Sequence, residues 1–255
     1  MLIDSHAHLD DDRFDNDRDK LIKSLKEYGI DLIINPGSDL GSSIQSVSLS
    51  EQYDNIYAAV GVHPHSAKEM DDSTIEVLKS FTGRKKVVAI GEIGLDYYYD
   101  NSPREIQCEK FIEQLNLAKE VDLPVIIHTR DAAQETFDIL KEAQDGSLEG
   151  VIHCYSGSVE MALEYIKMGF YISLGGPVTF KNARVSREVA KAVPIDKLLI
   201  ETDSPYLTPE PYRGKRNEPT YVRYVAGTIS ELRGISFDEL AKQTSENTKK
   251  LFRIK

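Results

Sequence analysis

Short apolar runs alternate along the chain with longer amphipathic segments. Eight of these runs are short and rich in Val, Ile, Leu and Tyr, which is typical of buried strands. They are residues 2–9, 31–37, 56–64, 87–97, 124–130, 150–157, 170–176 and 197–205. The segments between them carry apolar residues at helical spacing. In the segment 109–121, for example, Phe111, Ile112 and Leu115 form one stripe.

Regular alternation of strand and helix predicts βαβ units with a parallel sheet. Eight such units in a chain of 255 residues match an α/β fold, the (β/α)8 TIM barrel. An open, doubly wound sheet is the alternative. No linker rich in Pro, Gly or Ser interrupts the sequence, so we expect residues 1–255 to form a single domain.

All six histidines stand at the carboxyl ends of the predicted strands. They are His6, His8, His63, His65, His128 and His153. Two carboxylates, Glu92 and Asp203, hold equivalent places in the fourth and eighth runs. In a barrel these strand ends form one ring, where active sites are found, whereas an open sheet spreads them along an edge. The polar residues therefore favour the barrel.

A subset of these side chains combines imidazole nitrogens with carboxylate oxygens. The predicted metal ligands are His6, His8, Glu92, His128, His153 and Asp203. This donor set suits Zn²⁺, Mn²⁺ or Fe, and Mg²⁺ through the oxygen ligands. Six ligands are too many for one catalytic ion with an open position, so we expect two divalent ions about 3.5–4 Å apart. The alternative is a set of unrelated polar residues with ordinary hydrogen bonds.

Two cations in such a ring would activate a water molecule for hydrolysis. Asp203 is the candidate general base. Arg130 lies two residues after His128 and is a candidate contact for a substrate phosphate. Its alternative role is a salt bridge to a neighbouring loop. Glu201 shares a face with Asp203, and we expect it to support the ligands instead of binding the metal.

Seven stretches of the sequence resemble the TatD family of metal-dependent deoxyribonucleases, within the amidohydrolase-like metallohydrolases. They are "DSHAHLD", "GVHPH", "GEIGLDYY", "HTRDA", "HCYSG", "ETDSPYL" and "YRGKRNEP". The resemblance implies that His6 and His8 hold one ion with Asp203. It also implies that His128 and His153 hold the second ion and that Glu92, with a catalytic role, bridges the two.

The same resemblance implies hydrolysis of phosphodiester bonds in DNA, commonly supported by Mg²⁺. It favours His63 as a contact to the phosphate or the leaving group, while His65 is expected to be a solvated loop residue. Tyr97 to Tyr99, in the stretch "DYYYD", either stack on bases or cap the rim of the barrel.

A net charge of −11 argues against a large basic surface for duplex DNA. Arg213, Lys215 and Arg216 nevertheless stand close together, which predicts a local cationic rim that binds substrate. We therefore expect few phosphate contacts and cleavage of single-stranded or frayed DNA ends by an exonuclease. Two alternatives remain: a two-metal hydrolase of an amide, ester or lactone bond, and a noncatalytic metal-binding protein.

The sequence also indicates where the protein resides. The first apolar run carries Asp4 and His6, which is unlike a signal peptide, and no apolar run approaches the roughly 20 residues of a membrane span. Cys108 and Cys154 are too few for a disulfide framework. We expect a soluble cytoplasmic protein without a membrane partner.

Overall fold

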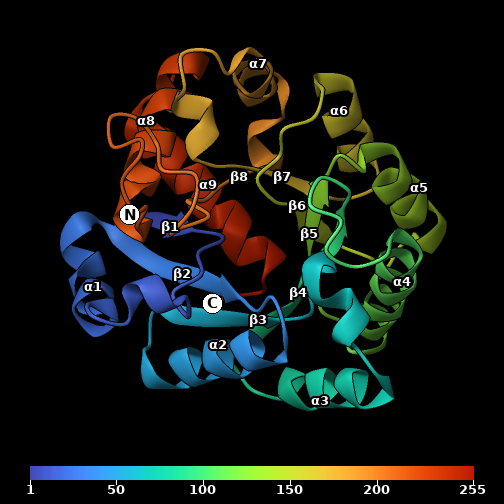
Figure 1. Ribbon diagram of the computed structural model, residues 1–255. Helices are drawn as coiled ribbons and strands as arrows, with labels where there is room; N and C mark the ends of the chain where they lie inside the picture. The colour runs from blue at the N-terminus through green and yellow to red at the C-terminus, as the bar shows by residue number, and fades with distance from the viewer. The chain divides into compact units, whose positions relative to one another are not determined.

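The computed structural model describes the whole chain, residues 1–255, apart from the side chain of residue 72. In these residues, eight strands follow one another in the sheet in chain order, and the paired strands run parallel (Figure 1). The strands are β1 (Leu2–Asp4), β2 (Ile30–Pro36), β3 (Ile56–Val60), β4 (Val87–Asp96), β5 (Val125–Arg130), β6 (Gly150–Ile152), β7 (Tyr171–Leu174) and β8 (Leu198–Ile200). Every predicted strand is therefore present.

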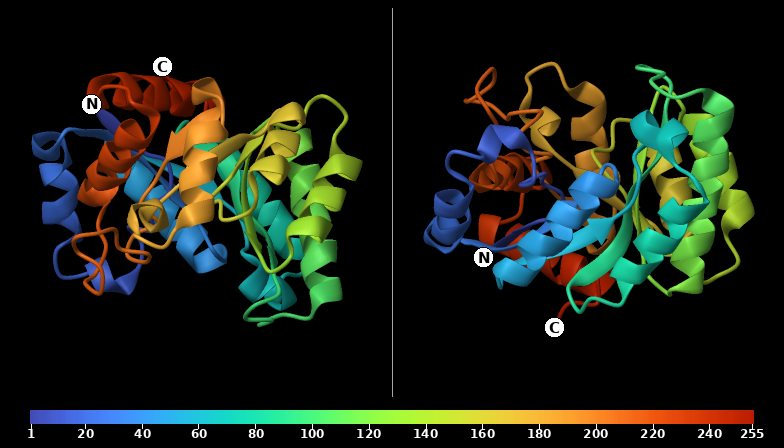
Figure 2. Two further views of the ribbon diagram at one scale, coloured as in Figure 1. Left: turned by 90° about the horizontal axis from the view of Figure 1, so that it is seen from above. Right: turned by 60° about the horizontal axis from the view of Figure 1, so that its bottom comes forward.

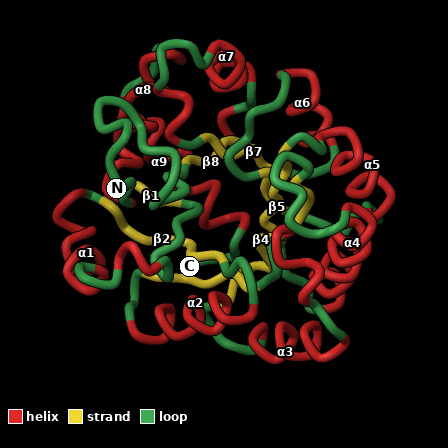
Figure 3. The backbone as a smooth tube through the Cα atoms, viewed as in Figure 1, coloured by secondary structure: helices red, strands yellow, loops and turns green.

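Helices connect the strands, as the alternating red and yellow segments of Figure 3 show. The α-helices are α1 (Arg18–Ser24), α2 (Leu40–Gln52), α3 (Asp72–Thr82), α4 (Arg104–Glu120), α5 (Ala133–Ala143), α6 (Val159–Lys167), α7 (Arg184–Ala192), α8 (Val222–Arg233) and α9 (Phe237–Leu251). This repeat is the (β/α)8 topology that the sequence predicts. Within the described part of the chain, none of these helices combines the length and the apolar content that a bilayer span needs.

The chain divides into two compact units. The terminal unit comprises residues 1–35, 153–167 and 171–255, and the central unit comprises residues 36–152 and 168–170. The terminal unit thus contains β1, β7, β8 and all but the last residue of β2, while β3 to β6 belong to the central unit. The expectation of a single domain stays a prediction.

In the terminal unit, α9 packs against β1 and β8, and α8 lies beside it (Figure 2). The helix begins after Ser236, whose hydroxyl accepts a hydrogen bond from the Glu239 N–H at 3.1 Å. This bond satisfies one of the free N–H groups at the helix start. Leu240 and Leu251 are buried. The helix therefore covers the strand that leads into His6 and His8 and the strand that leads into Asp203.

In the central unit, α2 packs against β3 and α4 against β4. Helix α4 buries Phe111 and Leu115, but Ile112 is 44% exposed, so the prediction that Ile112 lies on the buried stripe is wrong. The reason is that Gln107 and Gln114 are buried. Their amides bond to the backbone at the end of β4 and after β3. The buried face of α4 is turned toward these two glutamines.

The strands are shorter than the apolar runs, and this changes where the polar side chains lie. Glu92 and His128 are inside β4 and β5. Other predicted ligands follow a strand instead of ending it: His6, His8, His153 and Asp203. The chain after β1 bonds to other segments outside the regular ladder, as the bond from the Ala7 N–H to the Ile34 carbonyl shows (3.1 Å).

The register of β4 and β5 brings the two backbones close together at a glycine. Gly94 of β4 lies opposite His128 of β5, and Glu92 and Asp96 stand two residues to either side of Gly94 on the same face. Gly94 has a φ of +143°, and a Cβ atom there would come within 2.0 Å of the His128 carbonyl oxygen. Glycine is therefore required at this position.

We expect Gly94→Ala to lower the free energy of unfolding by at least about 1–3 kcal/mol, because the added methyl group forces the two strands apart. Chemical denaturation measures this change. The control is Gly227→Ala in α8, where a Cβ meets nothing within 4 Å. The control should stabilise the helix by up to about 1 kcal/mol. Wild-type stability of Gly94→Ala would contradict the tight contact between β4 and β5.

Candidate metal centres

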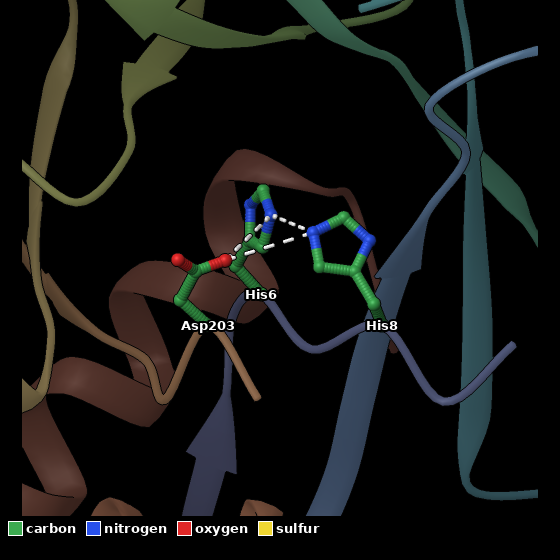
Figure 4. Close-up of side chains that lie close together, drawn as sticks. All are labelled: His6, His8 and Asp203. Carbon is green, nitrogen blue, oxygen red and sulfur yellow. Dashed lines mark hydrogen bonds and ion pairs between the residues drawn. The ribbon is translucent and has the colours of Figure 1, made fainter. Parts of the chain in front are cut away.

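The first cluster lies in the terminal unit and consists of His6, His8 and Asp203 (Figure 4). Two backbone hydrogen bonds align its segments. The Asp203 N–H donates to the His6 carbonyl at 2.9 Å, and the His8 N–H donates to the Ser204 carbonyl at 2.8 Å. Residues 6 and 8 flank Ala7, which pairs with Ser204, so both imidazoles leave the same side of an extended segment. The H-x-H spacing brings the rings together although β1 has already ended.

Three donor atoms converge in this cluster. Nε2 of His6 and Nε2 of His8 are 3.1 Å apart, and they lie 3.7 and 3.6 Å from Oδ1 of Asp203. Ligand bonds of about 2.0–2.2 Å place two donors on one ion about 3.0–3.6 Å apart, close to the separations seen here. Figure 4 shows one oxygen of Asp203 facing the imidazoles while the other points away. The cluster therefore fits a divalent cation.

Asp203 occupies an unusual backbone position and stays charged. Its φ of 55° is left-handed, a conformation that Asp and Asn tolerate better than most residues. Burial alone would raise the pKa of Asp203, but its contacts with His8, His6 and His153 hold this pKa below the ordinary value. The carboxylate is therefore anionic at neutral pH.

Asp4 fixes the segment that carries Asp203. Its carboxyl group accepts hydrogen bonds from the Thr202 N–H at 2.9 Å and from the Thr202 hydroxyl at 2.5 Å. Burial raises the pKa of Asp4 to about 8, although these hydrogen bonds act in the opposite direction. At neutral pH Asp4 is mostly uncharged, so it positions the loop without adding a second full negative charge.

His153 and Glu201 extend the first cluster. The rings of His6 and His153 stack with centroids 4.0 Å apart. Oε1 of Glu201 lies 3.3 Å from Nδ1 of His153 and accepts the Cys154 N–H at 2.7 Å. A buried carboxylate next to one nitrogen of a metal-binding histidine orients the ring and makes its other nitrogen a stronger metal ligand. This geometry agrees with the supporting role expected for Glu201.

The second cluster lies in the central unit and consists of His63, Glu92 and His128. Oε1 of Glu92 is 2.9 Å from Nδ1 of His128 and 3.6 Å from Nε2 of His63. The separation between Glu92 and His128 suits two ligands of one ion. The structure thus groups two predicted ligands with a residue that the sequence suggested as a substrate contact.

Asp96 organises the second cluster, although it is not among the ligands predicted from the sequence. Its Oδ2 lies 3.1 Å from Nε2 of His128 and 3.0 Å from Nε2 of His65, while its Oδ1 accepts the N–H groups of Tyr98 and Tyr99. Burial would raise the pKa of Asp96, but these bonds, that of His128 first, hold it well below its usual range. The carboxylate therefore turns Nδ1 of His128 toward Glu92.

A signal for Asp96 was present in the sequence. Asp96 stands four residues after Glu92, and side chains at that spacing leave the same face of a strand. His65 is also better ordered than expected: its ring is 33% exposed and bonds to Asp96, so its interpretation as a solvated loop residue is wrong.

His63 is arranged as a hydrogen-bond donor. Burial first, and then the neighbouring His128, push the pKa of His63 well below its ordinary value. Its Nδ1 accepts the His65 N–H at 3.2 Å, so the single proton of the neutral ring stands on Nε2. An Nε2–H group suits contact with a phosphate or a leaving group better than it suits metal ligation.

Each cluster lies within one unit. His128 belongs to the central unit and His153 to the terminal unit. The shared ion that the family resemblance implies for these two histidines, and the bridging role of Glu92, stay predictions.

The predicted cationic residues differ in what they already contact. Arg216 forms a two-pronged ion pair with Asp17, at 2.8 and 2.6 Å, and donates to the Arg13 carbonyl. Arg213 is exposed and lies over the Phe180 ring. Lys215 is also exposed. Arg216 thus holds its loop against the start of α1, whereas the charges of Arg213 and Lys215 face solvent.

Imidazole and carboxylate clusters on an eightfold βα repeat are those of a metal-dependent hydrolase. The chain belongs to the TatD family, since the family model described as TatD related DNase matches residues 3–253. It is 50% identical over 254 residues to YabD of Bacillus subtilis (strain 168), named an uncharacterized metal-dependent hydrolase, with 100% of both chains covered.

The chain is also similar to a relative that is named as a nuclease and to a TatD homologue of known crystal structure. The chain is 34% identical to the protein of Erwinia tasmaniensis named 3′-5′ ssDNA/RNA exonuclease TatD, covering 99% of this chain and 100% of that one. The crystal structure of YjjV, a TatD homologue from Escherichia coli K12, has a TM-score of 0.93 at 34% identity and covers 100% of this chain and 98% of that chain. The predicted TIM-barrel fold class and the family resemblance are confirmed.

We expect Asp96→Asn to weaken divalent-ion binding at the second cluster about 10–100-fold, because an amide has only one accepting oxygen and cannot accept from the two imidazoles on one side and from the N–H groups of Tyr98 and Tyr99 on the other. Titration of Mn²⁺ into ion-free protein by calorimetry measures this loss. The control is the exposed Asp196→Asn, which should bind as the wild type does. Unchanged Mn²⁺ affinity in Asp96→Asn would remove Asp96 from its orienting role.

Proposed function

We propose that the protein is a nuclease that hydrolyses phosphodiester bonds at single-stranded or frayed DNA ends, with one divalent ion in each cluster. The first cluster carries the proposal, because its three donor atoms lie within 3.7 Å of one another. The name of the Erwinia tasmaniensis relative, an exonuclease on single-stranded DNA and RNA, supports a nucleic-acid substrate. We expect Mg²⁺ to support activity, with Zn²⁺ or Mn²⁺ as the other ions that this donor set suits.

Divalent ions supply one part of the chemistry: when bound, they lower the pKa of the attacking water and polarise a phosphoryl oxygen. Asp203 acts as the general base. Its Oδ1 faces His6 and His8, while its other oxygen points away from them (Figure 4). This orientation supports the role of the second oxygen as the proton acceptor. His63 donates its Nε2–H to the phosphate or the leaving group. Glu92 and His128 hold the second ion.

We expect Asp203→Asn to lower kcat about 10²–10⁴-fold, the usual contribution of a general base, while circular dichroism stays unchanged. Asparagine tolerates the left-handed backbone at this position, so the fold should survive the substitution. The assay compares wild type and variant on end-labelled single-stranded DNA. Wild-type turnover of the variant at equal metal content would exclude Asp203 as the base.

The proposed function is tested by assaying ion-free and Mg²⁺-loaded protein on DNA labelled at the 3′ or the 5′ end, beside a simple ester and a lactone. We expect the Mg²⁺-loaded protein to hydrolyse DNA and the ion-free protein not to hydrolyse it. Full activity after chelation would contradict the metal mechanism. Hydrolysis of the ester or lactone without cleavage of DNA would show a hydrolase of a carbonyl substrate.

The charge distribution supports a substrate with few phosphate contacts. The chain carries a net charge of −11, and a long duplex needs many cationic contacts along its backbone. Arg213 and Lys215 offer two exposed cations that are close in sequence. They suit one or two phosphates of a flexible strand better than the many phosphates along an intact duplex.

We expect the double substitution Arg213→Ala with Lys215→Ala to raise KM for single-stranded DNA and to leave kcat nearly unchanged, because rim contacts bind ground state and transition state alike. The slope of log KM against log salt concentration should fall by about 0.7 for each phosphate that the variant no longer neutralises. Arg216→Ala should instead lower stability by about 1 kcal/mol, since it removes the ion pair with Asp17. Equal cleavage of closed circles and free ends, or a steep salt slope, would contradict end-directed cleavage.

A further inference from the structure

An aromatic and cationic surface stands on the central unit beside the second cluster. Tyr98 is 58% exposed and Tyr99 is 54% exposed, and their rings are nearly perpendicular with centroids 4.9 Å apart. The guanidinium carbon of Arg130 lies 4.0 Å from the Tyr98 centroid and 4.8 Å from the Tyr99 centroid. These three side chains, here called the tyrosine–arginine surface, come from the chain after β4 and from the end of β5.

The exposure of this surface is not the result of a loose loop. Oδ1 of Asp96 accepts the N–H groups of Tyr98 and Tyr99 at 3.1 and 2.9 Å, and the Arg130 carbonyl accepts the Tyr97 N–H at 2.9 Å. Large aromatic side chains gain stability when they are buried, so two exposed rings on an anchored backbone indicate a surface made for contact.

Tyr97 differs from the two tyrosines that follow it. Its hydroxyl donates to Glu135 at 2.7 Å and lies 3.3 Å from the Cys108 sulfur. It therefore ties the start of α5 to α4 and serves the scaffold. The hydroxyl of Tyr97 is thus already bonded within the scaffold, whereas the exposed rings of Tyr98 and Tyr99 are available for stacking.

Charge also favours an anionic occupant. Among the described residues, Arg130 makes no ion pair with an acidic side chain, and its contacts are the faces of two rings. A guanidinium plane stacked on an aromatic ring keeps its N–H groups at the edge, where they reach a phosphate.

The surface is tied to the second cluster through one carboxylate. The same Asp96 that holds the backbone of Tyr98 and Tyr99 with Oδ1 bonds to His128 with Oδ2. The ring of His65, which also bonds to Asp96, lies edge-on to Tyr99 with centroids 5.3 Å apart. A ligand on this surface would therefore lie close to His128, which is proposed to hold the second ion, with Asp96 between the two.

We propose that Tyr98, Tyr99 and Arg130 bind an unpaired nucleobase and its phosphate, and thereby select single-stranded over paired nucleic acid. The inference rests on the proposed nuclease function and adds to it the residues that discriminate substrate form. Every base has an aromatic face, so stacking on tyrosine or arginine does not depend on the base sequence. The face is accessible only when the base is unstacked, so this contact favours single strands. A duplex presents its bases already stacked and lacks this contact.

The test compares two short single-stranded DNA oligonucleotides, one with normal terminal nucleotides and one with abasic residues at the same end. Wild type should show a KM about tenfold or more lower for the normal oligonucleotide, because each stacked base contributes about 1–3 kcal/mol. Tyr98→Leu and Tyr99→Leu should raise the KM for the normal oligonucleotide toward that of the abasic one. Arg130→Lys, which keeps the charge but loses the planar group, should raise it as well.

The matched control is Tyr28→Leu, an equally exposed tyrosine (51%) in the terminal unit, which should keep the wild-type ratio of the two KM values. Thermal melting checks that each variant is folded. An unchanged ratio in both Tyr98→Leu and Tyr99→Leu overturns the proposal. So does a loss of ester or lactone hydrolysis equal to the loss on DNA, because the surface would then act on the whole site instead of on bases.

Failure of the nuclease function itself would be seen separately. Binding of a phosphorothioate oligonucleotide, which resists cleavage, is measured by fluorescence anisotropy without any turnover. Preference for the normal over the abasic phosphorothioate strand, lost in Tyr98→Leu, supports the stacking surface even if DNA is not hydrolysed. Equal binding of both strands by the wild type overturns it, and preferential binding of a protein partner at these residues would do the same.

Discussion

Buried carboxylates that face imidazole rings impose the constraint on which this structure depends. A buried charge is costly unless hydrogen-bond donors or a cation surround it. Asp203 meets this requirement with His6 and His8, and Asp96 meets it with His128 and two backbone N–H groups. Each carboxylate faces imidazole rings from a segment distant in the sequence, so these contacts link segments that lie far apart in the chain. The same arrangement brings imidazole nitrogens and carboxylate oxygens close enough together to bind a divalent ion.

The two clusters group their candidate metal ligands on different kinds of backbone. In the terminal unit the ligands stand on irregular chain, and short backbone bonds between the segments of His6 and Asp203 replace the regularity of a strand. In the central unit Glu92 and His128 stand inside paired strands, where Gly94 permits the close approach of the two backbones. Rigid backbone in both places holds the side chains in position, which a metal site requires.

Asp96 connects the chemistry to the surface. One carboxylate orients a candidate metal ligand with one oxygen and fixes two exposed tyrosines with the other. The net charge of −11 disfavours broad binding to nucleic acid, and the proposed contacts therefore rest on three exposed cations, Arg130, Arg213 and Lys215.

The sequence by itself determined the fold class and the set of metal-ligand candidates. Alternating apolar runs and amphipathic helices specify a parallel βα repeat, and such a repeat places the residues after each strand on one side. Only the tertiary structure decided which residues touch. The role of Asp96 depends on the register of β4 and β5. The contacts of the Tyr97 hydroxyl with α4 and α5, unlike the exposure of Tyr98, depend on how these helices pack. The ion pair of Arg216 depends on Asp17, which precedes α1. Those contacts join segments far apart in the chain, so no local pattern of residues reports them.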